Sequence, residues 1–190
     1  EAIQIANLHP RVEIFNPGVG VGGHCIGVDP WFLVEAAPGK SKLIKTAREI
    51  NDEQPRFVSD LITKAAGGLD GKTIALLGLA YKPNVDDLRE SPAVHLAHRL
   101  QDQGAVVYAY EPYKLDAGLP KINQVGSLDA ALINADVIVL AVGHEQFKDL
   151  DPEVIRKKTK ADLVFDAVKG WDKSAWEKAG FQFMGTARKF

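Results

Sequence analysis

The only cysteine of the chain, Cys25, lies in the segment Asn16–Pro30, which contains five glycines. Glycine removes side-chain bulk and permits positive φ angles, so the backbone amides of such a loop can approach a ligand closely. A predicted helix follows at once, with Asp29 as its N-cap and Pro30 as its first residue. Because free amides and the positive end of a helix dipole favour a thiolate, we interpret this segment as a loop that wraps a ligand or a nucleophilic Cys25.

Simpler interpretations of these residues stay open. A lone cysteine is usually a small buried apolar side chain, and Asp29 can cap a helix without taking part in chemistry. The spacing Gly18-x-Gly20-x-x-Gly23 matches the dinucleotide fingerprint, after a predicted extended run over residues 11–15. That fingerprint requires a helix and then a second strand ending in an acidic residue. Here a helix follows but no strand, so the glycines do not predict a nicotinamide site.

Three motifs occur in an order that is typical of one enzyme family. They are Gly22–Phe32 (GGHCIGVDPWF), Ala47–Asp52 (AREIND) and Gly78–Ala93 (GLAYKPNVDDLRESPA). The chain resembles the UDP-glucose/GDP-mannose dehydrogenase family, over the family's central and C-terminal UDP-binding portions. The residues around Cys25 are most similar to the branch that acts on UDP-N-acetyl-D-mannosamine.

The resemblance implies an NAD-dependent 6-dehydrogenase, which oxidises the C6 alcohol of a UDP-N-acetylhexosamine to a carboxylate by two hydride transfers. Cys25 would attack the intermediate aldehyde to form a thiohemiacetal and then a thioester, which water hydrolyses. Our hypothesis for Asp29 is that it orients this water. Family members hold NAD mainly in a preceding N-terminal domain, and no segment here matches that domain. We therefore expect a fragment, inactive alone, of an enzyme of polysaccharide biosynthesis.

The resemblance also assigns roles to particular residues. The expected contacts with the sugar nucleotide are His9 and Arg11, which would act across a subunit boundary, and Gly22, Tyr81, Lys82 and Lys169. Arg89 is the expected contact with NAD. Other roles compete: His9 and Arg11 suit a solvated helix end, Arg89 has acidic neighbours for ion pairs, and Lys169 fits an exposed turn.

Two further polar residues follow predicted strands. Glu111 stands where a dinucleotide-binding domain carries its ribose-binding acid, but the turn after the first strand has only Gly78 of the three fingerprint glycines. We therefore interpret Glu111 as a misleading sign of NAD. His144 follows another strand, and we predict a loop residue rather than a nucleotide contact. His24 has no partner that the sequence can name.

The spacing of apolar residues predicts the elements that position these side chains. Residues 30–37 and 41–52 are predicted helices, Pro55 restarts a helix, and residues 66–71 form a linker. Strands are expected at residues 73–77, 105–110, 137–142 and 163–166, with helices at residues 91–101 and 128–134. This alternation predicts an α/β fold. Residues 1–70 form a central helical region, and residues 71–190 form a Rossmann-like domain whose parallel sheet carries helices on both faces.

Composition narrows the class of protein further. The net charge of -2 gives no reason to expect nucleic acid or a membrane surface as a partner, and no apolar run is long enough to span a bilayer. One cysteine suits a reducing compartment, so we expect a cytoplasmic protein. His95 and His98 lie three residues apart without further ligands, and we predict no metal. The long helical arm predicts a homodimer, although its apolar face could also pack within the chain.

Three alternatives to this function stay open. The same reaction could act on UDP-N-acetylglucosamine or UDP-glucose. The chain could also be a UDP-sugar-binding module without a redox role, which a gene lacking the cofactor domain would support. A cysteine hydrolase would need a histidine to activate Cys25 and a third residue to orient it, and the sequence offers no evident third residue.

Overall fold

Six parallel strands form the centre of the C-terminal part of the chain in this computed structural model, which describes residues 2–186. The strand order is β3-β2-β1-β4-β5-β6, and neighbouring β1 and β4 pair from Ile74 with Val137 to Leu77 with Leu140. The strands are β1 (Thr73–Leu77), β2 (Val106–Tyr110), β3 (Asn123–Gln124), β4 (Val137–Leu140), β5 (Leu163–Asp166) and β6 (Gln182–Gly185). This order confirms the predicted α/β fold, and it puts a topological switch point between β1 and β4.

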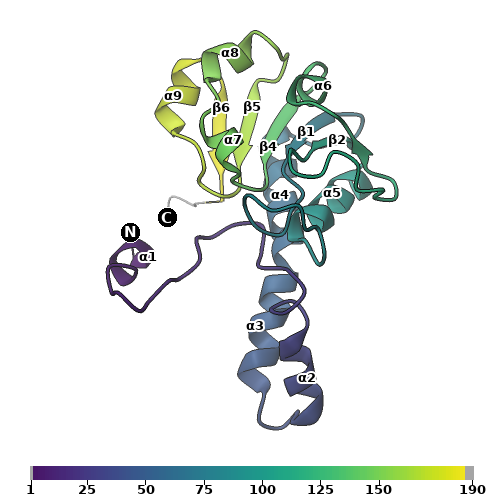
Figure 1. Cartoon of the computed structure of the whole chain (residues 1–190). Coiled ribbons are helices and arrows are strands. Elements are labelled where there is room, and N and C mark those ends of the chain that lie inside the picture. Colours follow the sequence, from purple (N-terminus) through teal and green to yellow (C-terminus); the bar gives the residue numbers. More distant parts are fainter. Residues whose placement is uncertain (1, 187–190) are drawn as a thin grey trace.

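Helices cover both faces of this sheet (Figure 1). Strand side chains alternate between the faces, so Ile74 and Leu76 enter one apolar cluster while Ala75 and Leu77 enter the other. The first cluster is closed by α4 (Gln54–Ala66) and α5 (Pro92–Asp102). The second is closed by α6 (Leu128–Leu132), α7 (Glu145–Lys148), α8 (Pro152–Arg156) and α9 (Lys173–Lys178). Both faces of the sheet are therefore shielded from solvent, as is usual for a parallel sheet.

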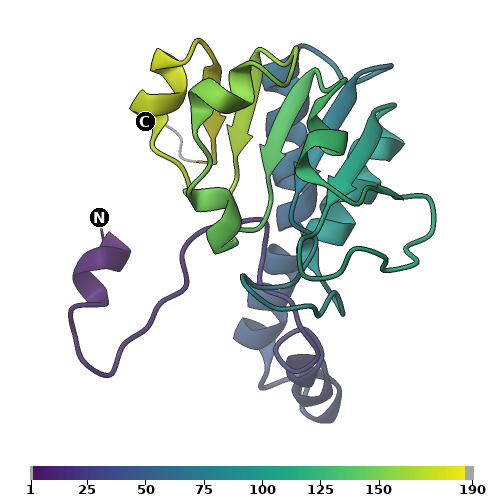
Figure 2. The ribbon, with the colours of Figure 1, turned by 45° about the horizontal axis from the view of Figure 1, so that its top comes forward.

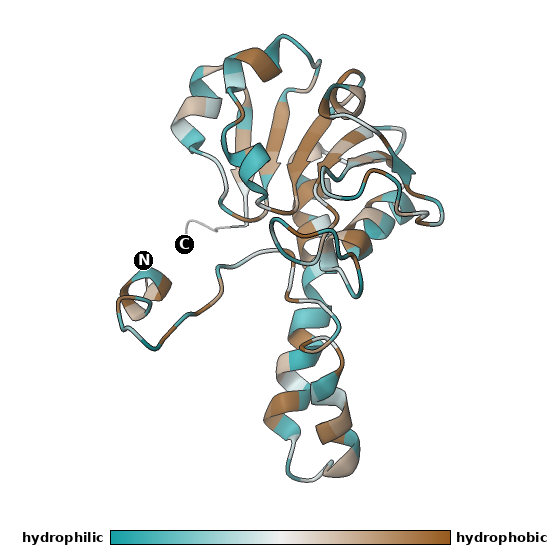
Figure 3. Cartoon of the chain, in the orientation of Figure 1, coloured by the Kyte–Doolittle hydropathy of each residue, from teal (hydrophilic) through white to brown (hydrophobic). Residues whose placement is uncertain are grey.

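Two helices form an arm that projects from the sheet domain, and we use "arm" for α2 (Asp29–Ala36) and α3 (Lys42–Asp52). They lie side by side as a hairpin, and α3 runs into α4 with only Glu53 between them (Figure 1). Several segments of the arm are hydrophobic, as the brown parts of Figure 3 show, and some of their side chains are exposed. They include Leu43 and Ile50, one heptad apart on α3 and exposed by 83% and 64%.

The N-terminal segment stands apart from the rest of the chain in two views (Figures 1 and 2). It consists of the short helix α1 (Ala2–Ala6) and an irregular stretch that leads to the glycine loop. The Asn7 side chain closes a turn here, because it accepts from the N–H of Ile14 and donates to its carbonyl oxygen. Residues 11–15 are exposed and form no strand, so the predicted extended run was wrong as a sheet element.

Helix and strand boundaries follow local chemistry in most places. Ser91 caps α5 by accepting from the N–H of Ala93, with Pro92 as the first helical residue, as its sequence predicts. Asp29, in contrast, is the first residue of α2, and Val28 occupies the N-cap position without a side-chain hydrogen bond, so the predicted cap was wrong. Strand β4 ends two residues earlier than predicted, and β3, β6 and α7–α9 were not predicted.

None of the helices within residues 2–186 is long and apolar enough to cross a membrane.

Candidate functional site

A cavity of about 680 Å³ lies beside the carboxyl ends of β1 and β4, at the switch point of the sheet. Open α/β sheets bind their ligands at this position. Five stretches far apart in the sequence supply the walls, and these are residues 15–26, 80–83, 92–93, 141–148 in part, and 168–170. Cys25, Gly22, Tyr81, Lys82 and Lys169 all line the cavity, so five of the nine predicted site residues come together there.

Cys25 is exposed on the turn that leads from the glycine loop into α2. Its carbonyl oxygen accepts from the N–H groups of Val28, at 3.0 Å, and Asp29, at 2.8 Å. The thiol therefore lies just before the first turn of a helix that carries Asp29 and Pro30, and the exposed position rules out the buried apolar role. Accessibility and this setting are what a nucleophilic cysteine needs.

The glycines of this loop are needed largely for packing against the turn that follows β1. A Cβ atom on Gly22 would lie 2.0 Å from the carbonyl oxygen of Glu90. One on Gly23, whose φ is +95°, would lie 2.8 Å from the Tyr81 ring. The absence of side chains at these two positions lets the Cys25 loop approach Tyr81 and so helps to form the cavity.

The Asn51 side chain holds the glycine loop against α3 by two hydrogen bonds. Its side-chain oxygen accepts from the N–H of Val21 at 2.8 Å, and its side-chain nitrogen donates to the Val21 carbonyl oxygen at 3.0 Å. The buried Arg48 guanidinium lies 3.4 Å from the same carbonyl oxygen and pairs with Asp52 at 2.5 Å. The sequence places Arg48 and Asn51 in a family motif but does not indicate these roles, because the contacts join positions about thirty residues apart.

Three lysines from three different segments face the cavity. Lys82 follows β1 and lies over the Tyr81 ring, 5.5 Å from its centroid. Lys169 is exposed, has a φ of +57° and lies in the loop after β5. The Asp166 carboxylate stabilises this loop, because it accepts hydrogen bonds from the N–H groups of Val168 and Trp171. Lys148 on α7 was not predicted from the sequence, since nothing in its neighbourhood marks it out. Three ammonium groups around one cavity suit a diphosphate.

Arg89 lies outside this cavity and forms an ion pair with Asp87 at 2.6 Å. Hydrogen bonds from Arg89 hold the pKa of Asp87 well below its usual range. Asp87 in turn raises the pKa of Arg89, with smaller contributions from Tyr81 and Cys25. Its guanidinium also lies 3.3 Å from Nδ1 of His24, so His24 faces an arginine.

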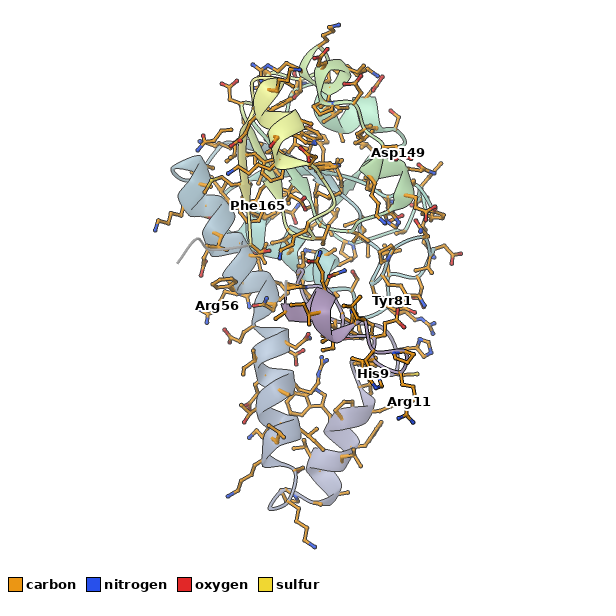
Figure 4. The ribbon with its side chains drawn as sticks, turned by 90° about the vertical axis from the view of Figure 1, so that its left-hand side faces the viewer. His9, Arg11, Arg56, Tyr81, Asp149 and Phe165 are labelled. Carbon is orange, nitrogen blue, oxygen red and sulfur yellow. The ribbon has the colours of Figure 1, made fainter. Side chains whose placement is uncertain are left out.

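The remaining predicted site residues lie away from the cavity. Nδ1 of His9 accepts from the N–H of Arg11 at 3.2 Å, and Figure 4 shows both side chains below the sheet domain, at the level of the arm. Tyr81, in contrast, lies where the domain meets the arm (Figure 4). Asp29 is exposed in the first turn of α2. Among residues 2–186, no group of three or more His, Cys, Asp or Glu side chains is placed to hold a metal ion.

Glu111 and His144 form a fully buried pair behind the turn that follows β1, with 3.0 Å between Nε2 of His144 and the Glu111 carboxylate. Burial raises the pKa of Glu111, but hydrogen bonds from His144, Leu79 and Tyr113 lower it more, and the net shift is downward. His144 lies in a loop and does not line the cavity, in agreement with the prediction, but its burial against Glu111 was not predicted. Its partners come from two other loops, which the sequence alone does not place beside it.

Comparisons with known proteins agree with this architecture. Residues 75–173 match the UDP binding domain of the UDP-glucose/GDP-mannose dehydrogenase family, and residues 1–53 match the central domain of that family. A UDP-N-acetyl-D-mannosamine dehydrogenase of Methanocaldococcus jannaschii is 45% identical over 185 residues, which are 96% of this chain and 42% of that protein. An NDP-N-acetyl-D-galactosaminuronic acid dehydrogenase of Ralstonia nicotianae is 46% identical over 165 residues, which are 85% and 39% of the two chains.

A solved structure, a UDP-D-ManNAc dehydrogenase from Pyrococcus horikoshii, superposes with a TM-score of 0.81 at 34% identity. The superposition covers 97% of this chain and 43% of that one. The chain thus spans about two fifths of the length of the relatives that it matches.

Proposed function

This chain belongs to the UDP-glucose/GDP-mannose dehydrogenase family, and from this premise we propose that it is the nucleophile-bearing and UDP-binding part of a UDP-sugar 6-dehydrogenase. The observation that carries the proposal is the cavity at the switch point, where an exposed thiol and three lysines from separate segments face one space. We propose UDP-N-acetyl-D-mannosamine as the substrate, because several similar proteins carry that name. UDP-N-acetylglucosamine and UDP-glucose remain the alternative substrates.

The proposed division of labour puts the catalytic loop and the dimer surface in residues 1–70, and the nucleotide site in residues 71–190. Tyr81 offers a ring face to the uridine or sugar, while Lys82, Lys148 and Lys169 offer charge to the diphosphate. This arrangement leaves the sugar near Cys25. His9 and Arg11 lie on the projecting N-terminal segment, which is the position required if they serve the site of a neighbouring subunit.

The sheet domain does not fit NAD, because the amides that would hold a pyrophosphate already have partners within the chain. The N–H of Gly78 donates to the Tyr110 carbonyl oxygen, those of Leu79 and Ala80 donate to Glu111, and that of Tyr81 donates to the Asp87 carbonyl oxygen. We therefore propose that NAD is held by another part of the enzyme, and that Arg89 reaches it from the surface of this chain. NAD would supply the hydride acceptor, with one molecule used for each of the two hydride transfers.

Cys25 has the covalent role in the proposed mechanism. Its thiolate adds to the carbonyl carbon of the C6 aldehyde, and the oxygen of the resulting thiohemiacetal keeps the electron pair until a proton reaches it. Loss of that proton from the oxygen and of a hydride from the carbon gives a thioester, and attack by water breaks the C–S bond and releases the carboxylate, the free thiol and a proton. Asp29 stays a proposed helper in this hydrolysis, and unchanged thioester hydrolysis in Asp29→Asn of a complete enzyme would exclude it.

Calorimetric titration of the chain with UDP and with NAD tests the proposed nucleotide site. We expect UDP to bind and NAD not to bind, and we expect Lys82→Ala to weaken UDP binding by about tenfold, the effect of one charged hydrogen bond. Lys64→Ala is the matched control, because α4 ends near the start of β1, at the opposite end of the sheet. Binding of NAD but not UDP would refute the proposal.

A further inference from the structure

The loop over residues 79–84, which carries Tyr81 and Lys82 to the cavity, is held from behind by buried side chains. The Glu111 carboxylate accepts from the N–H groups of Leu79 at 2.8 Å and Ala80 at 2.9 Å. Its second oxygen accepts from the N–H of Tyr113 at 3.0 Å. Glu111 and His144 are both fully buried, and neither lines the cavity. Any influence of theirs on a ligand is therefore indirect, through this loop or, for His144, through its neighbours Gly143 and Lys148, which also line the cavity.

His144 connects the other end of this loop to the same carboxylate. Its Nδ1 accepts from the N–H of Asn84 at 2.9 Å, so this nitrogen carries no hydrogen. The hydrogen must then be on Nε2, which donates to Glu111 at 3.0 Å. The assignment of the tautomer follows from the fact that a backbone N–H can only donate. The neutral ring of His144 is thus hydrogen-bonded both to the loop after β1 and to the Glu111 carboxylate, which follows β2.

Asn84 is the point where the loop is fixed in an unusual conformation. Its φ is +62°, and its side-chain oxygen accepts from the hydroxyl of Tyr113 at 3.2 Å and from the N–H of Glu145 at 3.0 Å. The Tyr113 ring lies over His144 with 5.0 Å between centroids. A non-glycine residue with positive φ persists only where its surroundings determine it. These contacts come from three loops, so the loop conformation depends on all of them.

We propose that Glu111 and His144 are positioning residues for nucleotide binding, which hold residues 79–84 so that Tyr81 and Lys82 face the cavity. In a dinucleotide-binding domain, the amides after the first strand receive a pyrophosphate and the acid after the second strand receives a ribose. Here the acid satisfies those amides itself. The turn is closed to a dinucleotide from within, and a diphosphate must bind on the outer side of the loop. This inference rests on the proposed function.

A double-mutant cycle on UDP affinity tests the inference with the full 190-residue chain. His144→Phe keeps the ring and its packing but leaves the Asn84 N–H without an acceptor, and we expect UDP to bind about tenfold more weakly. If His144 acts through the position of Lys82, the same substitution should change affinity by less than about twofold in a Lys82→Ala background. Glu111→Gln, which cannot accept from every present donor, should behave in the same way.

A buried control separates positioning from general destabilisation. Ile62→Val trims a fully buried side chain near the end of α4, which leads to the start of β1 at the opposite end of the sheet from the loop, and it should lower stability while leaving UDP affinity unchanged. A nitrogen-15 NMR measurement of the His144 ring, which needs no variant to fold, should find the hydrogen on Nε2.

Several results would overturn the inference. Additive losses for His144→Phe and Lys82→Ala would show that His144 acts independently of the loop. A hydrogen on Nδ1 of His144 would remove the proposed link. If Lys82→Ala weakens UDP binding but neither His144→Phe nor Glu111→Gln does, the proposed function stands and this inference fails. If the unmodified chain does not bind UDP, both fail.

Discussion

Glu111 illustrates how a charge can be stable inside this protein. A carboxylate without partners would be neutral in so dry a place, since burial disfavours the charged form. Three backbone N–H groups and the His144 ring supply its hydrogen bonds, and their combined effect lowers the pKa of Glu111 despite the burial. The same hydrogen bonds order the loops that provide them. The ionised carboxylate of Glu111 therefore contributes to the stability of the folded chain.

This dependence predicts a stability difference that changes with pH. Because the pKa of Glu111 is lowered in the folded chain, its contribution to stability is present above the unfolded pKa of about 4.3 and is lost as pH falls through the folded value. Glu111→Gln should lower the free energy of unfolding at pH 7 by about 1–3 kcal/mol.

Urea unfolding of the chain and this variant between pH 7 and pH 3 measures the difference. We expect the gap between the two free energies to narrow below pH 5. Asp87, whose pKa is also lowered, is present in both proteins, so its effect cancels in the comparison. A gap that stays constant down to pH 3 would mean that Glu111 is not a charged acceptor.

The sequence alone predicts only some of the residues of the candidate site. Cys25, Tyr81, Lys82 and Lys169 could be predicted because each lies in a motif or directly after a strand, and strand ends gather at one edge of a parallel sheet. His144 and Lys148 could not, because their importance depends on which loops face each other. Such long-range contacts leave no local mark in the sequence.

At the scale of elements, the arm and the glycine loop act as one unit. Helix α3 presents Asn51 to Val21, and the loop in turn packs Gly22 and Gly23 against the turn after β1. The elements themselves were predictable where apolar spacing and caps agreed, as for α5 and β1. Short elements such as β3, with only two residues, carry too little pattern to be predicted. The contact between Asn51 and Val21 is tertiary and could not be predicted either.

We expect Asn51→Ala to loosen the glycine loop without unfolding the sheet. Loss of the two hydrogen bonds to the backbone of Val21 should expose its amide and accelerate its hydrogen exchange by about 5- to 30-fold, equivalent to about 1–2 kcal/mol. Amides within β1 and β4 should exchange at unchanged rates. Native-state exchange followed by NMR gives both rates in one experiment.

Asn51→Asp is the matched control for this prediction, because it keeps the acceptor for the Val21 N–H and loses only the donor to the carbonyl oxygen. Its exchange rate should lie between those of the other two proteins. Equal Val21 exchange in all three would show that other contacts hold the loop.

At the scale of the whole molecule, we propose that the arm joins two copies of the chain. Leu43 and Ile50 form an exposed stripe on α3, and Phe32 on α2 is 64% exposed as well. Exposed apolar side chains that gather on adjoining helices mark interaction surfaces. A second arm would cover this stripe.

Sedimentation velocity tests this proposal directly. We expect the chain to sediment as a dimer at micromolar concentration, and the double variant Leu43→Glu, Ile50→Glu to sediment as a monomer, since burying two charges in an apolar interface is costly. Val154→Glu on α8, which changes a side chain of 44% exposure outside the arm, should remain dimeric. A monomeric unmodified chain would refute the arm as an interface.

The walls of the cavity come from positions as far apart as residues 15 and 170, and this separation ties recognition to folding. The side chains proposed to hold the nucleotide lie within residues 71–190, and the glycine loop of residues 15–26 forms the opposing wall of the same cavity. A nucleotide bound in the cavity would therefore contact both parts at once. It would raise the free energy needed to separate the glycine loop from the sheet, and also the free energy needed to unfold either part. The unliganded chain and its complex should accordingly differ most in how cooperatively the two parts unfold.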